Sequence, residues 1–324
     1  DLAQTSLSGI FNSRRVNASI APIFIGLLPS PGAAFIAGDM VKKSCAGYLD
    51  NDEQTFVTSY FRHIPESCLP TYSCILLALQ LSGVETSAFM LGMLPMVVLL
   101  VVLGFAFYLR KVPRDTGLPP APSKGRECLK LLDSMWAIAL SIVLILAFNV
   151  PVYAAVGLCI ALYFLLGVCL KRIKPKQVLP FFISAFELRI VVNTFVVMAF
   201  KEILTATGVI NTLSATLSTL PIQPFVIFMI LFFVGTIVSG STAIVALGIP
   251  LAFAAVPGAG MPLLVLLMCC TYAAMQLSPT HICLTLIAEY FNTNLGVLVK
   301  KTIPVIAVFY VVLVPYYLLL EFLF

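Results

Sequence analysis

Long apolar runs separated by short polar loops make up most of the chain. Five of these runs come close to or exceed the roughly 20 apolar residues that one membrane crossing needs. They cover residues 87–109, 131–148, 151–169, 178–200 and 303–322. Of the 324 residues, 60% are hydrophobic and only 10% are charged. This pattern is typical of an all-α polytopic membrane protein, whose first partner is the lipid bilayer.

One apolar segment, residues 18–40, is interrupted in its middle by Pro29, Ser30, Pro31 and Gly32. Each arm holds about ten residues, or roughly 15 Å of helix, and therefore reaches only the midplane of a bilayer. We expect a re-entrant hairpin, because irregular backbone at that depth is tolerated only where it lines a cavity or is buried in protein. A proline-kinked crossing or an interfacial loop is the alternative.

Lysine and arginine gather in the short loops and set the predicted topology. They occur at Arg14, Arg15, Lys42, Lys43, within 110–130 and 171–176, and at Lys300 and Lys301. The positive-inside rule places these loops in the cytoplasm and leaves Lys201 as the one external basic residue. The net charge of +5 therefore indicates topology, and no nucleic-acid partner is expected.

The interrupted segment has a second copy further along the chain. A shift of 209 residues carries Ser30 onto Ser239, Pro70–Cys74 onto Pro279–Cys283, and Pro95 onto Pro304. Five crossings are predicted between the hairpin tips at Ser30 and Ser239. Because five is odd, the second copy is inverted, and its hairpin at 222–257 enters from outside. Inverted repeats with broken helices are typical of secondary transporters. Two ordinary short crossings are the alternative for 222–257.

The repeat divides the chain into a first repeat at 1–110, a cytoplasmic linker at 111–130 and a second repeat at 131–324. The first holds the hairpin 18–40, a broken helix 52–83 and the helix 87–109. The second holds the helices 131–148, 151–169 and 178–200, the re-entrant hairpin 222–257, a broken helix 261–290 and the helix 303–322. Since no leading helix precedes the first hairpin, we expect the first repeat to be N-terminally incomplete.

Small hydroxyl residues flank each predicted break in a helix. Half-helix N-termini offer free N–H groups that suit a carboxylate, and half-helix C-termini offer carbonyls that suit sodium. The candidate binding residues are Ser30, Pro31, Gly32, Thr71, Tyr72, Ser239, Gly240, Ser241, Thr242, Ser278, Pro279, Thr280 and His281. Sodium is a candidate ion at Ser30, Ser239 and Thr242. The alternative for each hydroxyl is a bond to the carbonyl one turn earlier, and for His281 a packed ring satisfied by one carbonyl.

The remaining polar residues of the apolar runs rank lower as ligands. An interfacial position suits Glu66 and the neighbouring Arg62–His63 pair. Glu187 and Arg189 lie two residues apart in an apolar run, where each needs another partner. Nine cysteines without paired CxxC spacing read as small core residues, so neither a zinc site nor a disulfide framework is expected.

Several motifs resemble those of a known membrane family. GLLPSPGAA, SYFRHIPE, LPTY, FKEILTATGVI, SGSTA and LSPTHICLTLIAEYF are similar to the family named domain of unknown function 401, over nearly the whole chain. That family is similar to the ion transporter superfamily, which includes gluconate permeases and sodium-coupled dicarboxylate carriers. The resemblance implies a homodimer in a prokaryotic inner membrane, with a scaffold part, a transport part and elevator-type movement. Neither tip carries the Ser-Asn-Thr triplet of the dicarboxylate carriers.

The sequence thus predicts a secondary active transporter, a symporter of a small anionic organic solute coupled to sodium or protons. No enzyme activity and no cofactor other than sodium are expected. A passive anion channel is the second hypothesis. An intramembrane enzyme is the third, because the chain has no HExxH motif and few carboxylates within its apolar runs.

Overall fold

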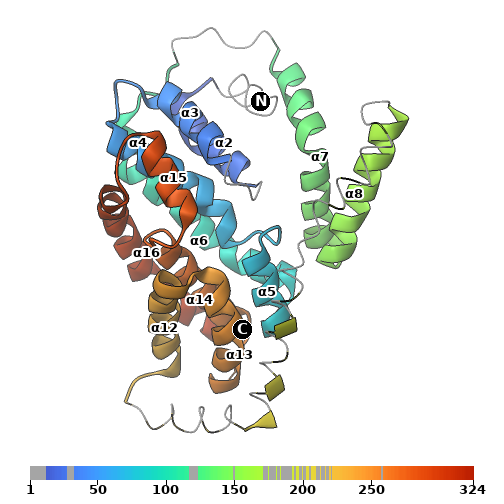
Figure 1. The fold of residues 1–324 in the computed structure, drawn as a ribbon, viewed down its shortest axis with the longest axis vertical. Coiled ribbons are helices and arrows are strands. Elements are labelled where there is room, and N and C mark those ends of the chain that lie inside the picture. The colour runs from blue at the N-terminus through green and yellow to red at the C-terminus, as the bar shows by residue number, and fades with distance from the viewer. Residues whose placement is uncertain are drawn as a thin grey trace.

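The computed structural model describes residues 12–27, 33–116, 123–148, 150–170, 221–256 and 258–324, together with single positions between 171 and 220. In chain order its helices are α2 (Arg14–Gly26), α3 (Ala33–Cys45), α4 (Asn51–His63), the 3₁₀ turn η1 (Ile64–Ser67), α5 (Ser73–Ser82), α6 (Thr86–Phe107), η2 (Leu109–Lys111), α7 (Lys124–Phe148), α8 (Val152–Cys169), α12 (Pro224–Ser239), α13 (Ser241–Ala255), α14 (Met261–Met275), α15 (Ile282–Tyr290) and α16 (Leu295–Leu323). Figure 1 shows their arrangement. The prediction of an all-α protein is confirmed for these residues.

Three of the described helices, α6, α8 and α16, are long and apolar enough to cross a membrane. Their bounds include most of the runs predicted at 87–109, 151–169 and 303–322, while 178–200 lies largely outside the described residues. Two helices begin earlier than predicted. α7 starts at Lys124, inside the predicted linker, and α16 starts at Leu295, where the Asn294 side chain accepts a bond from the Val297 amide. Hydropathy marks the apolar part of a helix, whereas its backbone bonds continue through charged residues.

The helices repeat along the chain in the same order: a helical pair, a broken helix and a long helix. α5 and α15 begin at Ser73 and Ile282, and α6 and α16 begin at Thr86 and Leu295, so both pairs are 209 residues apart. This is the offset that relates the two sets of sequence motifs. The pair α2–α3 lies at the upper end of Figure 1 and the pair α12–α13 at the lower end.

Packing between the two copies is reciprocal. The second arm of each helical pair packs on the second half of the other copy's broken helix, α3 on α15 and α13 on α5. Each long helix packs on the first half of the other copy's broken helix, α6 on α14 and α16 on α4. The broken helices are therefore enclosed by elements of both copies. The two copies of the repeat together form one packed body. α7 and α8 form a separate pair at the side of this body (Figure 1).

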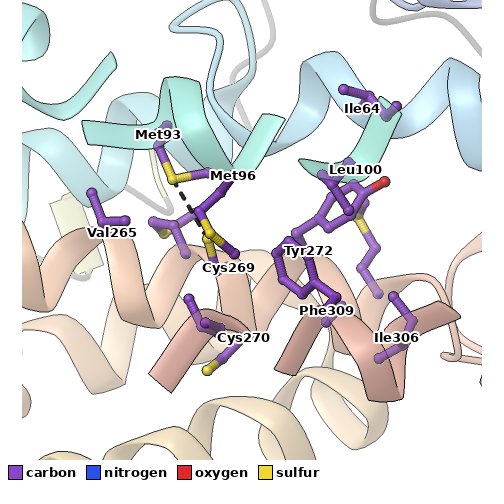
Figure 2. Close-up of a cluster of buried hydrophobic side chains, with 14 of the residues drawn as sticks. Ile64, Met93, Met96, Leu100, Val265, Cys269, Cys270, Tyr272, Ile306 and Phe309 are labelled. Carbon is purple, nitrogen blue, oxygen red and sulfur yellow. Dashed lines mark hydrogen bonds between the residues drawn. The ribbon is translucent and has the colours of Figure 1, made fainter. Parts of the chain in front are cut away.

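The core of this body lies where α6, α14 and α16 meet. Figure 2 shows Met93 and Met96 of α6 facing Cys269 of α14, with Phe309 of α16 nearby. The Cys269 thiol lies 3.7 Å from the Met93 sulfur. None of the nine cysteines forms a disulfide, and five of them are buried. A packing role therefore suits Cys269, as the sequence predicted.

Basic segments from distant parts of the chain gather at one end of the molecule. The Arg15 guanidinium donates to the Val112 carbonyl over 2.6 Å. Lys111 pairs with Glu53, and the Lys301 ammonium lies 3.9 Å from the same carboxylate. These three segments belong to the loops that the positive-inside rule assigned to a single side.

Candidate functional site

Two polar cavities lie where the α12–α13 pair meets the two broken helices. The first, of about 210 Å³, is lined by Thr236, Ser239, Gly240, Ser241, Thr242, Ala243, Met275, Ser278, Thr280 and His281. The second, of about 180 Å³, is lined by Glu66, Tyr72, Ser73, Cys74, Ser241, Thr242, Met268, Thr271, Tyr272, Met275 and His281. Because the two sets of residues share Ser241, Thr242, Met275 and His281, the cavities adjoin and form one candidate site.

Three helices begin at these cavities. α5 starts at Ser73, α13 at Ser241, and α15 directly after His281. None of the three has a side-chain cap on its first amides. Uncapped N–H groups and the positive ends of helix dipoles favour an anion. The convergence of three such ends makes the site suited to a carboxylate or a similar group.

Gly240 makes the junction of α12 and α13 possible. Its backbone, at φ 85° and ψ 160°, lies in a region that is essentially restricted to glycine. The chain can therefore reverse direction at a single residue. Close packing of the two helices supports the turn, since a Cβ on Gly248 would lie 2.5 Å from the Phe232 ring.

Hydroxyl groups connect the break after α14 to the tip of the α12–α13 pair. The Ser278 hydroxyl donates to the Ile237 carbonyl over 3.0 Å and lies 2.8 Å from the Thr280 hydroxyl. The Ser239 hydroxyl, in contrast, donates over 2.7 Å to the Gly235 carbonyl one turn earlier. Ser239 thus adopts the local alternative weighed from the sequence, while its lone pairs remain available to a cation.

Several polar atoms on the cavity walls are buried without a hydrogen-bond partner among the described residues. They are the Thr236 hydroxyl, the Tyr272 hydroxyl and one carboxylate oxygen of Glu66. Buried polar groups in native proteins are nearly always paired. These three groups are therefore positioned to contact a polar solute in the cavities.

The two histidines of the chain meet beside the second cavity. Nε2 of His281 lies 3.0 Å from Nε2 of His63, which is fully buried at the end of α4. Nδ1 of His63 lies 2.6 Å from the Ser59 carbonyl and donates to it. A Glu66 carboxylate oxygen lies 4.0 Å from His63 Nε2 and 3.9 Å from His281 Nε2. Together with the Cys283 thiol, the imidazoles offer donor atoms within 4.8 Å of one another.

The structure brings most of the described candidate residues to this site. Ser239, Gly240, Ser241, Thr242, Ser278, Thr280, His281 and Tyr72 line one or both cavities. Pro279 is exposed, and Thr71 lines a separate apolar cavity together with residues of α7 and α8. Ser30, Pro31, Gly32, Glu187 and Arg189 lie outside the described residues.

Two residues that precede the break between α4 and α5 lie closer to the candidate site than the sequence indicated. His63 is fully buried and Glu66, which is half-buried, lines the second cavity, although the sequence ranked both below the hydroxyl groups. A signal was present in the repeat: the 209-residue offset carries His63 onto Tyr272 and Tyr72 onto His281. The four residues therefore occupy related positions in the two broken helices.

Comparison with known proteins assigns the chain to a family. A family model described as protein of unknown function (DUF401) matches residues 3–320. The chain belongs to this family. The DUF401 match covers both copies of the repeat, including both breaks that form the candidate site. No curated protein matches the chain.

Proposed function

We propose that this DUF401 protein is a secondary active transporter of a small anionic organic solute with a carboxylate-like group. The single observation that carries the proposal is the convergence of three uncapped helix N-termini, from α5, α13 and α15, on polar cavities. Fixed backbone dipoles attract an anion without the need for a lysine or arginine side chain in the cavity wall.

The size and lining of the site fit a small polar solute. The two adjoining cavities, of about 210 and about 180 Å³, together lie near the lower end of the roughly 300–1,000 Å³ range of ligand pockets. The buried oxygens of Thr236, Tyr272 and Glu66 that have no hydrogen-bond partner among the described residues provide further polar contacts. Hydroxyl groups of the solute, as in a sugar acid, match this lining.

We infer that both helical pairs are re-entrant. α12 and α13 have 16 and 15 residues, or roughly 24 Å of helix, while the hydrocarbon core of a bilayer is about 30 Å thick. α2 and α3 have 13 residues each and are shorter still. Two short pairs at opposite ends of a reciprocal repeat support a site near the bilayer midplane, the arrangement that is typical of secondary transporters.

An elevator-type movement is consistent with the arrangement of α7 and α8. An apolar cavity of about 430 Å³ lies between this pair and the body that holds the site, and Thr71 and Ile142 are among its lining residues. We propose that α7 and α8 belong to a scaffold part and that the protein is a homodimer in a prokaryotic inner membrane. The resemblance to the ion transporter superfamily supports this reading.

Thermal unfolding of the full-length protein in detergent tests the proposal. Acetate, succinate, gluconate and citrate are added separately, each with sodium or with potassium and at two pH values. An anion at about one hundred times its dissociation constant adds roughly 2.7 kcal/mol to the native state. A saturable rise in the midpoint with one anion supports the proposal. Absence of any shift in a folded protein would argue against an anion carrier.

Two serines provide a matched control for the site. Ser239 and Ser141 each donate to the carbonyl four residues earlier, but only Ser239 lines the polar cavities. We expect Thr280→Ala to weaken the affinity behind the anion-dependent shift by about tenfold, since one hydrogen bond to a charged group contributes about 1.5 kcal/mol. We expect Ser239→Ala to weaken it as well, because the Ser239 hydroxyl must turn from the Gly235 carbonyl to donate to the anion. Ser141→Ala should leave affinity unchanged. Equal affinity in all three variants would contradict the placement of the solute.

A further inference from the structure

The histidine pair stands out because the whole chain contains only two histidines. They are 218 residues apart in sequence, and each belongs to a different broken helix. Their Nε2 atoms nevertheless lie 3.0 Å apart. The contact joins the only two imidazoles of the chain beside cavities that His281 lines. Binding of an anion by helix N-termini does not require such a pair.

Hydrogen bonding fixes where protons sit on the neutral pair. A neutral imidazole has one N–H, and His63 uses its own at Nδ1 to donate to the Ser59 carbonyl. Nε2 of His63 therefore carries a lone pair and accepts a hydrogen bond from Nε2–H of His281. Because two N–H groups cannot share this 3.0 Å contact, the pair has room for one additional proton and not for two.

Among the residues that the structure describes, few charged or titratable groups surround the pair. Arg62, which precedes His63 in the chain and is buried at the end of α4, places a positive charge beside the pair, and a like charge disfavours an added proton. The Glu66 carboxylate, 3.9–4.0 Å from both Nε2 atoms, favours it. Cys283 on α15, Tyr72 before α5 and Tyr272 on α14 are the other titratable neighbours and are neutral in their ordinary forms, and α13 contributes only hydroxyl groups to the second cavity.

Charge balance links this proton to the solute. With both imidazoles neutral and the Glu66 carboxyl ionised, the charges of Arg62 and Glu66 cancel. An anion in the cavities adds one negative charge to a site of low dielectric, where an uncompensated charge is costly. One proton taken from water in the cavity onto the pair restores neutrality, and its release to water on the other side restores the empty state.

We propose that His63 and His281 together bind the coupling proton, one per solute anion, so that the protein is a proton symporter. This inference rests on the proposed transport function and specifies its coupling ion. His281, which lines both cavities, is the ring through which the proton enters and leaves. Glu66 is the counter-charge of the protonated pair, and Arg62 sets the requirement that the proton enters with the anion.

Nitrogen NMR of the full-length protein in lipid nanodiscs, labelled with ¹⁵N only at histidine, tests proton binding without any solute. Two imidazoles give two sets of signals, which His63→Gln and His281→Gln assign. Between about pH 8 and about pH 4, around the range in which histidine titrates, we expect one imidazolium per chain while the second ring stays neutral. Arg62→Gln should raise the proton affinity at least tenfold, and Glu66→Gln should lower it.

Two results of this titration would overturn the proton site. One is independent protonation of both rings, and the other is a midpoint that neither Arg62→Gln nor Glu66→Gln moves. Should the fully buried His63 prove essential for folding, His281→Gln still tests the coupling, because the remaining ring should then titrate as a single uncoupled group. One zinc ion per chain retained through purification, and lost in both histidine variants, would assign the pair to a metal instead.

Proton uptake on anion binding distinguishes this inference from the transport proposal. The carboxylate that raises the unfolding midpoint is added to the protein in weak buffer containing a pH-sensitive dye. We expect uptake of about one proton per bound anion in the wild type and none in His281→Gln. Anion binding without proton uptake contradicts the coupling site and leaves the carrier intact. If no carboxylate binds, the transport proposal fails, and the NMR titration still decides whether the pair holds a proton.

Discussion

Tyr72 connects two elements of the site by a single hydrogen bond. Its hydroxyl donates to the carbonyl of Gly26, the last residue of α2, and its ring lines the second cavity. This bond joins the end of α2 to the break between α4 and α5. The shape of the second cavity therefore depends on both elements. The loss of this hydroxyl leaves a carbonyl without its partner.

We expect Tyr72→Phe to lower the free energy of unfolding by about 1–3 kcal/mol, the usual effect of an unpaired buried acceptor, and also to weaken anion binding. Tyr316→Phe is the matched control, because the Tyr316 hydroxyl likewise donates to a glycine carbonyl, that of Gly92, away from the cavities. Both variants should unfold earlier in denaturant titrations, and only Tyr72→Phe should lose affinity. Equal affinity in the two would separate Tyr72 from the site.

Single residues were predictable where their type implied the chemistry. Ser241, Thr242 and Thr280 stood out because hydroxyl groups beside a helix break suit a polar ligand. The pairing of His63 with His281 was not predictable from composition, since it depends on how two broken helices cross. The local bond of Ser239 to Gly235 was one of two alternatives, and side-chain geometry decides between them.

At the scale of elements, the close packing of α12 on α13 depends on glycines at the points where the two helices touch. A Cβ on Gly235 would lie 2.5 Å from Cδ1 of Ile244, and one on Gly248 would lie 2.5 Å from the Phe232 ring. Such contacts are shorter than van der Waals distance. Small residues at helix contacts allow backbones to approach closely in membranes, where packing is a principal source of stability.

Gly248→Val should therefore separate α12 from α13 and displace the tip at Gly240. We expect a loss of about 1–3 kcal/mol in stability, typical of overpacking, together with loss of anion binding. Gly157→Val in α8 is the control, because nothing lies within 4 Å of a Cβ at Gly157. Thermal unfolding with and without the anion measures both effects. Binding retained in Gly248→Val would show that the site does not require the close packing of this pair.

Element boundaries were predictable where the chain changes composition. Proline, glycine and hydroxyl residues marked the break between α4 and α5 and the tip between α12 and α13. The early starts of α7 and α16 were missed because charged residues such as Lys124 and Lys300 do not interrupt backbone hydrogen bonds. Polarity and helicity are separate properties at the ends of long helices.

At the scale of the whole molecule, reciprocal packing relates the two copies of the repeat. An inverted topology predicts that the outer ends of the two helical pairs face opposite sides of the membrane. Lys43, near the end of α3, and Gln223, directly before α12, are both exposed and mark these two ends. Their accessibility to a membrane-impermeant reagent distinguishes inverted from parallel copies.

We expect Gln223→Cys to react with an impermeant maleimide in intact cells, and Lys43→Cys to react only after the membrane is opened. The background carries Cys128→Ser and Cys169→Ser, because these are the two exposed cysteines. This background without the added cysteine is the control for residual labelling. Reaction of both added cysteines from the same side would contradict the inverted arrangement.

Family membership and the 209-residue repeat could be predicted from the sequence, because motif order and offset are properties of the chain itself. The meeting of three helix N-termini at one site could not, since it follows from how α5, α13 and α15 pack across the two copies. Homodimer formation and elevator movement stay predictions that the family resemblance implies.

Counterflow in proteoliposomes tests whether the protein is a carrier of carboxylates. Vesicles containing the full-length protein are loaded with the carboxylate that raises the unfolding midpoint and diluted into a trace of the same radiolabelled anion. We expect transient accumulation of label that saturates with internal anion, persists in Ser141→Ala and falls about tenfold in Thr280→Ala. Label entry that rises linearly without saturation, or equal accumulation in protein-free vesicles, would contradict a carrier with its site at the tip of α12–α13.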